Sequence, residues 1–322
     1  MSDKIKQIHS GKRLLLHKQG LDNRNKYINV DNNLFYENLL ENRKCPVCFV
    51  KNQKNLFNKW GGTYVQCNSC NMIYLNPVFK DIELSNYYET NVAEQGEVVS
   101  DDVLFYEKIY TSGLSMVATE VKKGANLLDI GCSSGVFLDI AKSKGWNTYG
   151  IELNNIEYSV VKKKDHKVYN KNIIEVEFPE QFDLITLWDV FEHIKDGYNY
   201  IKYIQGLLTK DGVIFLQIPS IDSIAARIMR EKCNMFDGLE HVNLYGIESL
   251  TKLVEASGMK ILNIKSVISE LSVLNNYLNY SDPYKKECND CCYDFSSIIP
   301  EDKILDILQG YKLQVVIGRK SV

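Results

Sequence analysis

The sequence has little of what marks fibrous, low-complexity or membrane-spanning chains. Its 322 residues include only 6 Pro and 19 Gly, and 45% of the residues are hydrophobic. No apolar run approaches the roughly 18 residues that a membrane-spanning helix needs, and residues 14–16 are the only apolar stretch near the start. These features exclude collagen-like and disordered chains, and we expect a cytoplasmic globular protein without a membrane partner.

The chain also lacks a strong net charge. Its 38 Lys and Arg against 41 Asp and Glu give a formal net charge of -3, so no general positive field favours nucleic acid as a partner. Residues 1–26 are a local exception, with seven basic and two acidic residues, a balance of 7 - 2 = +5. We expect residues 1–40 to form a polar arm that is solvated or loosely docked, with a segment that contacts an anion or a partner as the alternative.

Four of the nine cysteines follow a spacing typical of zinc sites. The pattern is C-x2-C-x18-C-x2-C, in which each pair presents two thiolates from one tight turn, and its members are Cys45, Cys48, Cys67 and Cys70. Four protein ligands leave no open coordination position, so we predict a structural Zn²⁺. The metal would replace the core that a module of about 40 residues, placed at 41–80, is too short to build.

The other cysteines carry weaker signals. Cys132 lies in a glycine-containing turn, and Cys233 is expected to be a buried thiol. The cluster Cys288, Cys291 and Cys292 has no fourth ligand beside it. We expect those three thiols to be free, with a second metal site as the alternative.

Strand and helix patterns alternate after residue 81. Apolar strand-like runs lie at 126–133, 147–153, 182–190, 212–219 and 259–267, and amphipathic helical stretches separate them. This alternation is typical of a mostly parallel sheet covered by helices, and therefore of an α/β fold.

The run LLDIGCSSG, residues 127–135, combines a buried strand with a glycine-containing turn. Gly131 and Gly135 permit a close approach of the backbone to a ligand, and Asp129 lies at the end of the strand. Glu152 follows 23 positions later, at the end of the next strand, where a carboxylate can accept both ribose hydroxyls of an adenosine. A packing turn without a ligand is the alternative, whereas the spacing does not fit the G-x-G-x-x-G turn that seats a pyrophosphate.

These motifs together resemble the class I S-adenosylmethionine-dependent methyltransferases, in particular the bacterial sugar and small-molecule methyltransferases. DIGCSSG is similar to the family's D-x-G-x-G-x-G turn with Ser133 in place of the middle glycine, and FDLITLWDVFEHIKD, LTKDGVIFLQIPS and EHVNLYGIESL are similar to later family patterns. The resemblance implies a Rossmann-like seven-stranded sheet with helices on both faces over residues 81–322. Members of this group also carry similar N-terminal zinc modules.

The resemblance also implies a set of residues that bind the cofactor. The methionine part would meet the glycine turn and the end of the 182–190 strand, and the ribose and adenine would meet residues after the second and third strands. The residues are Asp129, Gly131, Cys132, Ser133, Gly135, Glu152, Leu153, Asn172, Trp188 and Asp189.

Methyl transfer to a hydroxyl is assisted by a base at the acceptor, and a free histidine with a pKa of about 6.5 suits that role. His193 is the first candidate, with Glu192 beside it to orient the imidazole or bind an acceptor hydroxyl, and His241 is the second. A purely structural role for either histidine is the alternative. Val190 stands where the resembling C-methyltransferases have a tyrosine, which favours transfer to oxygen. The long segment 270–300 is a possible substrate lid.

We therefore expect methyl transfer from S-adenosylmethionine to a sugar, a nucleotide-linked sugar, a glycan or a related small metabolite. A sugar C-methyltransferase, an RNA methyltransferase with a zinc module and a non-catalytic cofactor-binding scaffold are the alternatives. No motif identifies the acceptor or the oligomeric state.

Overall fold

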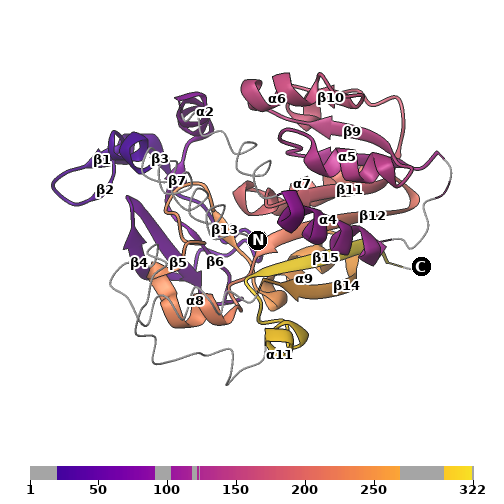
Figure 1. The fold of residues 1–322 in the computed structure, drawn as a ribbon. Helices are drawn as coiled ribbons and strands as arrows, with labels where there is room; N and C mark the ends of the chain where they lie inside the picture. Colours follow the sequence, from indigo (N-terminus) through magenta and orange to yellow (C-terminus); the bar gives the residue numbers. More distant parts are fainter. Residues whose placement is uncertain (1–19, 91–102, 118–121, 123, 269–300, 321–322) are drawn as a thin grey trace, which may run out of the picture. The chain divides into compact units, whose positions relative to one another are not determined.

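The computed structural model describes residues 20–90, 103–117, 122, 124–268 and 301–320 (Figure 1). The possible lid at 270–300 and the cysteines at 288, 291 and 292 lie outside the described residues, as does the first half of the polar arm. Among the helices that are described, none combines the length and the apolar character needed to cross a membrane. The described chain forms two compact units.

Unit 2 takes in the described residues of 92–218, 251–264 and 314–320 and contains a seven-stranded sheet. The strand order is β10-β9-β8-β11-β12-β15-β14, so the last strand of the chain lies between the fifth and sixth. The strands are β8 (Asn126–Ile130), β9 (Asn147–Ile151), β10 (Lys167–Tyr169), β11 (Phe182–Trp188), β12 (Leu208–Pro219), β14 (Met259–Val267) and β15 (Lys312–Arg319).

The first five of these strands run parallel. β8 pairs with β9 on one side and β11 on the other, while β10 pairs with β9 and β12 with β11. The chain therefore proceeds outward from β8 in one direction and then returns to continue in the other. Such a reversal creates a crevice at the carboxyl ends of the two central strands, here β8 and β11, where α/β proteins bind ligands. The predicted Rossmann-like sheet of seven strands is confirmed.

Two helices pack on this sheet through a shared apolar cluster. Leu114 of α4 (Val103–Val117) and Phe137 of α5 (Val136–Ser143) join Leu127, Trp188 and Phe215 of the strands. The remaining regular elements of unit 2 are α6 (Asn155–Val161), η2 (Ile173–Glu175), η3 (Phe191–His193), α7 (Gly197–Leu207) and the larger part of α9 (Ile247–Ala256). The cluster fixes Trp188 directly beneath the carboxyl end of β11.

Unit 1 contains the cysteine pairs and a second, four-stranded sheet in the order β13-β6-β5-β4. The first three strands along the chain are β4 (Gln53–Lys59), β5 (Gly62–Cys67) and β6 (Ile73–Leu75). The fourth, β13 (Asn243–Leu244), comes from the EHVNLY stretch and pairs antiparallel with β6. The sequence did not indicate that this stretch joins the sheet of the cysteine module.

The core of unit 1 is shared between the cysteine module and residues 219–250. Tyr64 of β5 packs on Phe236 and Phe57, with ring centroids 5.0 and 5.6 Å apart. α8 (Ile224–Met229), η4 (Arg230–Lys232) and α11 (Glu301–Asp306) complete the unit, and Cys233 is buried in the same cluster, as expected. A chain segment too short to build a core of its own thus gains apolar partners from residues about 170 positions away.

The described part of the polar arm is folded. β1 (Ile28–Asn29) and β2 (Leu34–Phe35) form a hairpin, and after η1 (Glu37–Leu39) the short β3 (Leu40–Glu41) pairs with β7 (Val78–Phe79), which precedes α2 (Asp81–Thr90). Phe35 packs edge-on against Phe79 at 4.7 Å, and Arg24 is only 5% exposed. Residues 20–40 therefore differ from the solvated arm that their composition suggests.

Candidate functional site

The turn after β8, residues 130–135, is here called the cofactor turn. Gly131 and Gly135 have φ of 76° and 83°, values that L side chains rarely adopt. The N–H groups of Gly131 and Cys132 both donate to the Ile151 carbonyl, at 2.8 and 3.0 Å, and so tie the turn to the end of β9. The turn thus lies at the carboxyl ends of β8 and β9, where the sequence placed it.

Ser133 occupies the position of the family's middle glycine and also has a positive φ, 47°. Its N–H donates to Glu152 Oε2 at 2.8 Å, and its hydroxyl donates to Glu157 Oε2 at 3.1 Å. These two hydrogen bonds offset the cost of a left-handed conformation in a residue with a Cβ. The serine therefore preserves the glycine turn rather than opening it.

Glu152 lies directly after β9 and anchors the surrounding backbone. Besides Ser133 N–H, its carboxylate accepts the Asn154 N–H at 2.7 Å, and burial raises its pKa above the ordinary glutamate value. Because each carboxylate oxygen accepts two hydrogen bonds, capacity remains for ligand hydroxyls. Leu153 beside it is 61% exposed, and Asn172 caps η2 by accepting the Ile174 N–H at 3.3 Å.

Asp129 is an almost fully buried acidic residue at the switch point. Its side chain accepts a hydrogen bond of 2.6 Å from the Thr186 hydroxyl. Burial, together with the nearby Glu152 carboxylate, raises its pKa to about 8. A cation bound beside Asp129 would compensate for this burial and favour the carboxylate form.

Trp188 ends β11 inside an aromatic cluster. Its ring lies 4.7 Å from Tyr110, 5.0 Å from Phe137 and 4.5 Å from Phe215. Its Nε1 is buried and has no hydrogen-bond partner within the described part of the chain. A buried N–H without an acceptor costs free energy, which a ligand acceptor would recover.

Asp189 follows Trp188 in the sequence and has a φ of 55°. Its carboxylate is the end of a chain of hydrogen bonds from two glutamine side chains. Gln217 donates to the Asp189 carboxylate at 3.0 Å, and Gln314 of β15 donates to Gln217 Oε1 at 2.8 Å. Both glutamines are almost fully buried. Neither glutamine was predicted as a site residue, although a glutamine inside each apolar run, IFLQIP and LQVVIGR, is a signal for a buried polar role.

The residues predicted as catalytic lie in both units. Glu192 and His193 belong to η3 in unit 2, with Glu192 1% exposed and His193 partly buried. Val190, which precedes η3, faces the cofactor turn so closely that a Cβ on Gly131 would lie 2.6 Å from its Cγ2. η3 therefore holds the two residues beside the cofactor turn.

His241 lies in unit 1, in residues 235–243, here called the histidine loop. Its Nδ1 is 2.8 Å from the Met235 carbonyl oxygen. Because a carbonyl only accepts, Nδ1 carries the proton and Nε2 holds the lone pair of the neutral ring. That tautomer has the proton-accepting nitrogen which a general base requires.

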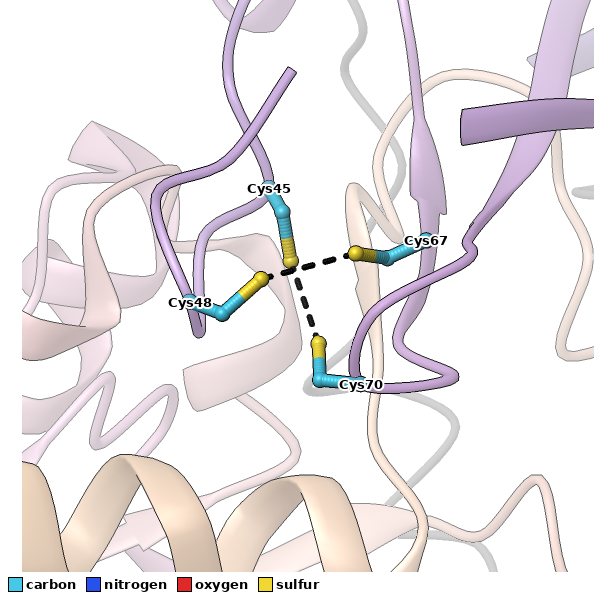
Figure 2. Close-up of side chains that lie close together, drawn as sticks. All are labelled: Cys45, Cys48, Cys67 and Cys70. Carbon is cyan, nitrogen blue, oxygen red and sulfur yellow. Dashed lines mark hydrogen bonds between the residues drawn. The ribbon is translucent and has the colours of Figure 1, made fainter. Parts of the chain in front are cut away.

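The four predicted metal ligands converge in unit 1, with their sulfur atoms facing one another (Figure 2). All four Sγ atoms lie within 4.8 Å of each other. The Sγ atoms of Cys45 and Cys70 are 3.4 Å apart, and those of Cys48 and Cys67 are 3.5 Å apart. A disulfide would require about 2.05 Å, whereas Zn–S bonds of about 2.3 Å in a tetrahedron separate the sulfurs by about 3.8 Å. The donor set and its spacing therefore fit Zn²⁺.

The two cysteine pairs adopt the same backbone turn despite different sequences. In the first, the Phe49 N–H donates to the Cys45 carbonyl at 3.0 Å, and in the second Asn71 donates to Cys67 at the same distance. Phe49 and Asn71 both have positive φ, 62° and 59°. Matching turns that present two sulfurs each are what a four-thiolate site requires.

Comparison with known proteins agrees with the fold. Residues 105–264 match the family model described as "Methyltransferase domain", just under half of the chain. The ubiquinone biosynthesis O-methyltransferase of Stutzerimonas stutzeri is 26% identical over 100 residues, 29% of this chain and 43% of that protein. Its counterpart in Actinobacillus pleuropneumoniae is 30% identical over 105 residues, which cover 29% of this chain and 44% of that protein. The chain thus spans less than half the length of these relatives.

Solved structures resemble the chain more loosely. One is the methyltransferase in a complex with the Haloferax volcanii Trm112 activator, with 12% identity and a TM-score of 0.48 over 70% of this chain and 94% of that one. A Clostridium acetobutylicum S-adenosylmethionine-dependent methyltransferase has 15% identity and a TM-score of 0.41 over 61% and 85%. Residues 105–264 are thus similar to a methyltransferase domain, and this match supports the predicted enzyme class, an S-adenosylmethionine-dependent methyltransferase.

The residues around the cofactor turn fit S-adenosylmethionine in their chemistry. Asp129 is a buried carboxyl whose pKa a cation would lower, and Glu152 retains acceptor capacity for ribose hydroxyls. The Trp188 indole N–H has no partner within the described residues. A sulfonium compound with an adenosine and an amino acid carboxylate offers a counterpart to each group.

Proposed function

We propose that the chain transfers a methyl group from S-adenosylmethionine to a hydroxyl oxygen of a sugar, a nucleotide-linked sugar or a related small metabolite. The observation that carries the proposal is the pairing of a fully buried Asp129 with Glu152 at the switch point of the sheet. Burying two acidic groups near each other without a cation is unfavourable. A cationic, adenosine-bearing ligand accounts for both.

Within this proposal the cofactor residues divide by location. Asp129, Gly131 and Asp189 meet the methionine part together with Cys132, Ser133, Gly135 and Trp188. Glu152 holds the ribose, while the exposed Leu153 and Asn172 lie beside the adenine. The orienting hydrogen bonds from Thr186 to Asp129 and from Gln217 to Asp189 support the first group.

A histidine takes the proton from the acceptor hydroxyl in this proposal. His193, with Glu192 to orient it or bind an acceptor hydroxyl, is the first candidate from the sequence, and the tautomer of His241 supports His241 as the base. Because methyl transfer is an in-line displacement, these side chains also serve to hold the acceptor oxygen at the methyl group.

Transfer to oxygen is favoured over transfer to carbon. Val190 stands where the resembling C-methyltransferases carry a tyrosine, and it packs against the cofactor turn rather than reaching an acceptor. The names of the relatives from Stutzerimonas stutzeri and Actinobacillus pleuropneumoniae, both O-methyltransferases, support the same choice.

We also propose that the four cysteines bind one structural Zn²⁺, and that the protein acts in the cytoplasm, where free thiols persist. The matching turns and the converging sulfurs support the metal. Since all four positions are taken by thiolates, the metal has no place for an acceptor.

The test is release of S-adenosylhomocysteine from the zinc-loaded chain with panels of nucleotide-sugars, free sugars and phenolic metabolites. Release with one panel, and loss of that release in Asp129→Ala, would support the proposal. Tight cofactor binding without release in any panel would favour a scaffold, and salt-sensitive RNA binding with methylated RNA as product would favour the RNA alternative. Either outcome would overturn the small-molecule proposal.

A further inference from the structure

Several of the contacts that hold the histidine loop come from residues next to the cysteines. The Tyr64 hydroxyl donates to the His241 carbonyl at 3.3 Å and accepts the Gly238 N–H at 3.1 Å. Tyr64 lies three positions before Cys67 on β5. One side chain of the cysteine module therefore fixes the backbone at two points of the loop, one of them His241 itself.

Arg43 makes a second connection, from two positions before Cys45. Its guanidinium donates to the Leu75 carbonyl at 3.0 Å, to the Val242 carbonyl at 2.5 Å and to Asn243 Oδ1 at 2.8 Å. A buried guanidinium that joins β6 to the residue after His241 is a strong and geometrically specific link.

The backbone of β6 makes the third connection. The Leu75 N–H donates to the Val242 carbonyl at 3.0 Å, and Asn243 and Leu244 pair with Tyr74 and Ile73. β6 begins three positions after Cys70. All three connections thus start within five residues of a cysteine, and each has a contact at His241 or within three residues after it.

The loop also packs against the module without space between them. A Cβ on Gly62 would lie 2.0 Å from the Gly238 carbonyl oxygen, and one on Gly238 would lie 2.1 Å from the Lys59 carbonyl oxygen. The other side of His241 is set within the loop, where the Asp237 carboxylate accepts the N–H groups of residues 239, 240 and 241 at 2.8 to 3.2 Å. The imidazole therefore receives its orientation from Met235, and its backbone position from the module together with Asp237.

We infer that the four-cysteine module is a positioning device for His241, with Tyr64 and Arg43 as positioning residues. The metal would fix the two turns, the turns would fix β5, β6 and Arg43, and these would hold the backbone on which the Nδ1–H tautomer of His241 depends. Occupancy of the cysteines then controls the base without any contact between the metal and the acceptor. This inference rests on the proposed role of His241 in the reaction.

The test compares two tyrosines of the same sheet. Tyr64→Phe removes the hydroxyl that holds His241, whereas Tyr74→Phe removes a hydroxyl that donates to Gln53 at 2.6 Å and does not touch the loop. In Tyr64→Phe we expect kcat to fall about tenfold with the KM for S-adenosylmethionine unchanged, and zinc content to stay at the wild-type level. Tyr74→Phe should keep the wild-type kcat.

The tautomer of His241 supplies a readout that a general loss of stability would not move. In the ¹⁵N spectrum of the zinc-loaded chain with S-adenosylhomocysteine, assigned with His241→Gln, the wild type and Tyr74→Phe should show Nδ1–H. Tyr64→Phe, and the chain after zinc is removed with a chelator, should show a mixture of tautomers. If Tyr64→Phe does not fold, Arg43→Lys, which keeps the charge but loses the guanidinium fork, replaces it.

The outcomes separate this inference from the proposed function. An unchanged kcat and an unchanged tautomer in Tyr64→Phe, with loss of turnover in His241→Gln, would overturn the positioning role and leave the proposed function standing. Normal turnover in His241→Gln would instead remove the histidine from the reaction, whatever its tautomer.

Discussion

The cofactor turn of unit 2 and the histidine loop of unit 1 are built in opposite ways. The partners that hold Ser133 in the cofactor turn lie 19 and 24 residues away along the chain. Tyr64 and Arg43 reach the histidine loop across 177 and 199 residues. The first site is set by one strand-turn-helix and its neighbour, whereas the second depends on two distant segments folding together. We therefore expect the two sites to respond differently to substitution.

The largest difference should follow loss of the metal. Cys67→Ser leaves three ligands, and structural zinc sites contribute roughly 10–16 kcal/mol in zinc-finger peptides. We expect the variant to lose its zinc and the amides of β5 and β6 to lose their protection from hydrogen exchange. The cofactor turn does not depend on the cysteines, so the dissociation constant for S-adenosylhomocysteine should change less than about threefold.

Cys233→Ala is the matched control, because Cys233 is buried in the same unit but lies outside the pairs. It should keep one zinc per chain by elemental analysis and lose only the stability of one small core side chain. A wild-type chain that carries no zinc after purification in zinc-containing medium, or a Cys67→Ser variant with normal exchange protection, would contradict the structural metal.

The second largest effect should come from the histidines. General-base catalysis contributes about 10²- to 10⁴-fold, so the variant that removes the base, His241→Gln or His193→Gln, should lower kcat by at least about 100-fold. The affinity for S-adenosylmethionine should stay at the wild-type level in both. Comparing the two kcat values assigns the role, and full turnover in both variants would mean that solvent accepts the proton.

Asp129 gives a smaller effect with a characteristic pH dependence. Its pKa is about 8 in the folded chain and about 3.9 when unfolded. The folded state therefore holds an extra proton on Asp129 between these values, so the contribution of Asp129 to stability without cofactor is fully present below about pH 4, is lost as the pH rises towards 8, and levels off above it. Asp129→Asn keeps an acceptor for the Thr186 hydroxyl and removes the loss of stability that accompanies deprotonation of Asp129.

We therefore expect Asp129→Asn to melt at a higher temperature than the wild type at pH 8–9, by about 3 °C or more, and to differ less at pH 5. Its affinity for S-adenosylmethionine should be about tenfold lower, since the carboxylate is absent. A wild-type melting temperature that rises between pH 5 and 8 without cofactor, relative to Asp129→Asn, would contradict the raised pKa of Asp129.

The sequence predicted the parts of the molecule that depend on local spacing. DIGCSSG, Glu152 and the cysteine pairs all lie where their motifs indicated, because a turn or a two-cysteine loop is determined by fewer than ten consecutive residues. The pairing of β13 with β6 was not predictable in the same way. A two-residue strand has no periodicity of its own, and its partner is chosen by the packing of residues 219–250 on the cysteine module.

The residues that hold the candidate site residues in place were also not predictable from local spacing. Tyr64, Arg43 and Gln314 are common residue types in ordinary surroundings along the chain, and each becomes informative only when its partner is known. Ser133 shows the converse. The sequence allowed the turn to survive with a serine, and the hydrogen bond to Glu157 explains how it does so.

The smallest effect should come from the amide chain behind Asp189. Gln314→Met keeps the length of the side chain but removes the donor to Gln217, so Gln217 loses the bond that fixes its own donation to Asp189. The buried Oε1 of Gln314, which has no partner among the described residues, disappears with it, and removing an unsatisfied polar atom offsets part of the lost hydrogen bond. We expect a melting temperature within about 2 °C of the wild type and a cofactor affinity two- to fivefold lower. Gln217→Met, which removes the direct donor to Asp189, should lower the affinity further. Equal affinities in the two variants would show that Gln314 does not act through Gln217, and that the chain of amides ends at its second member.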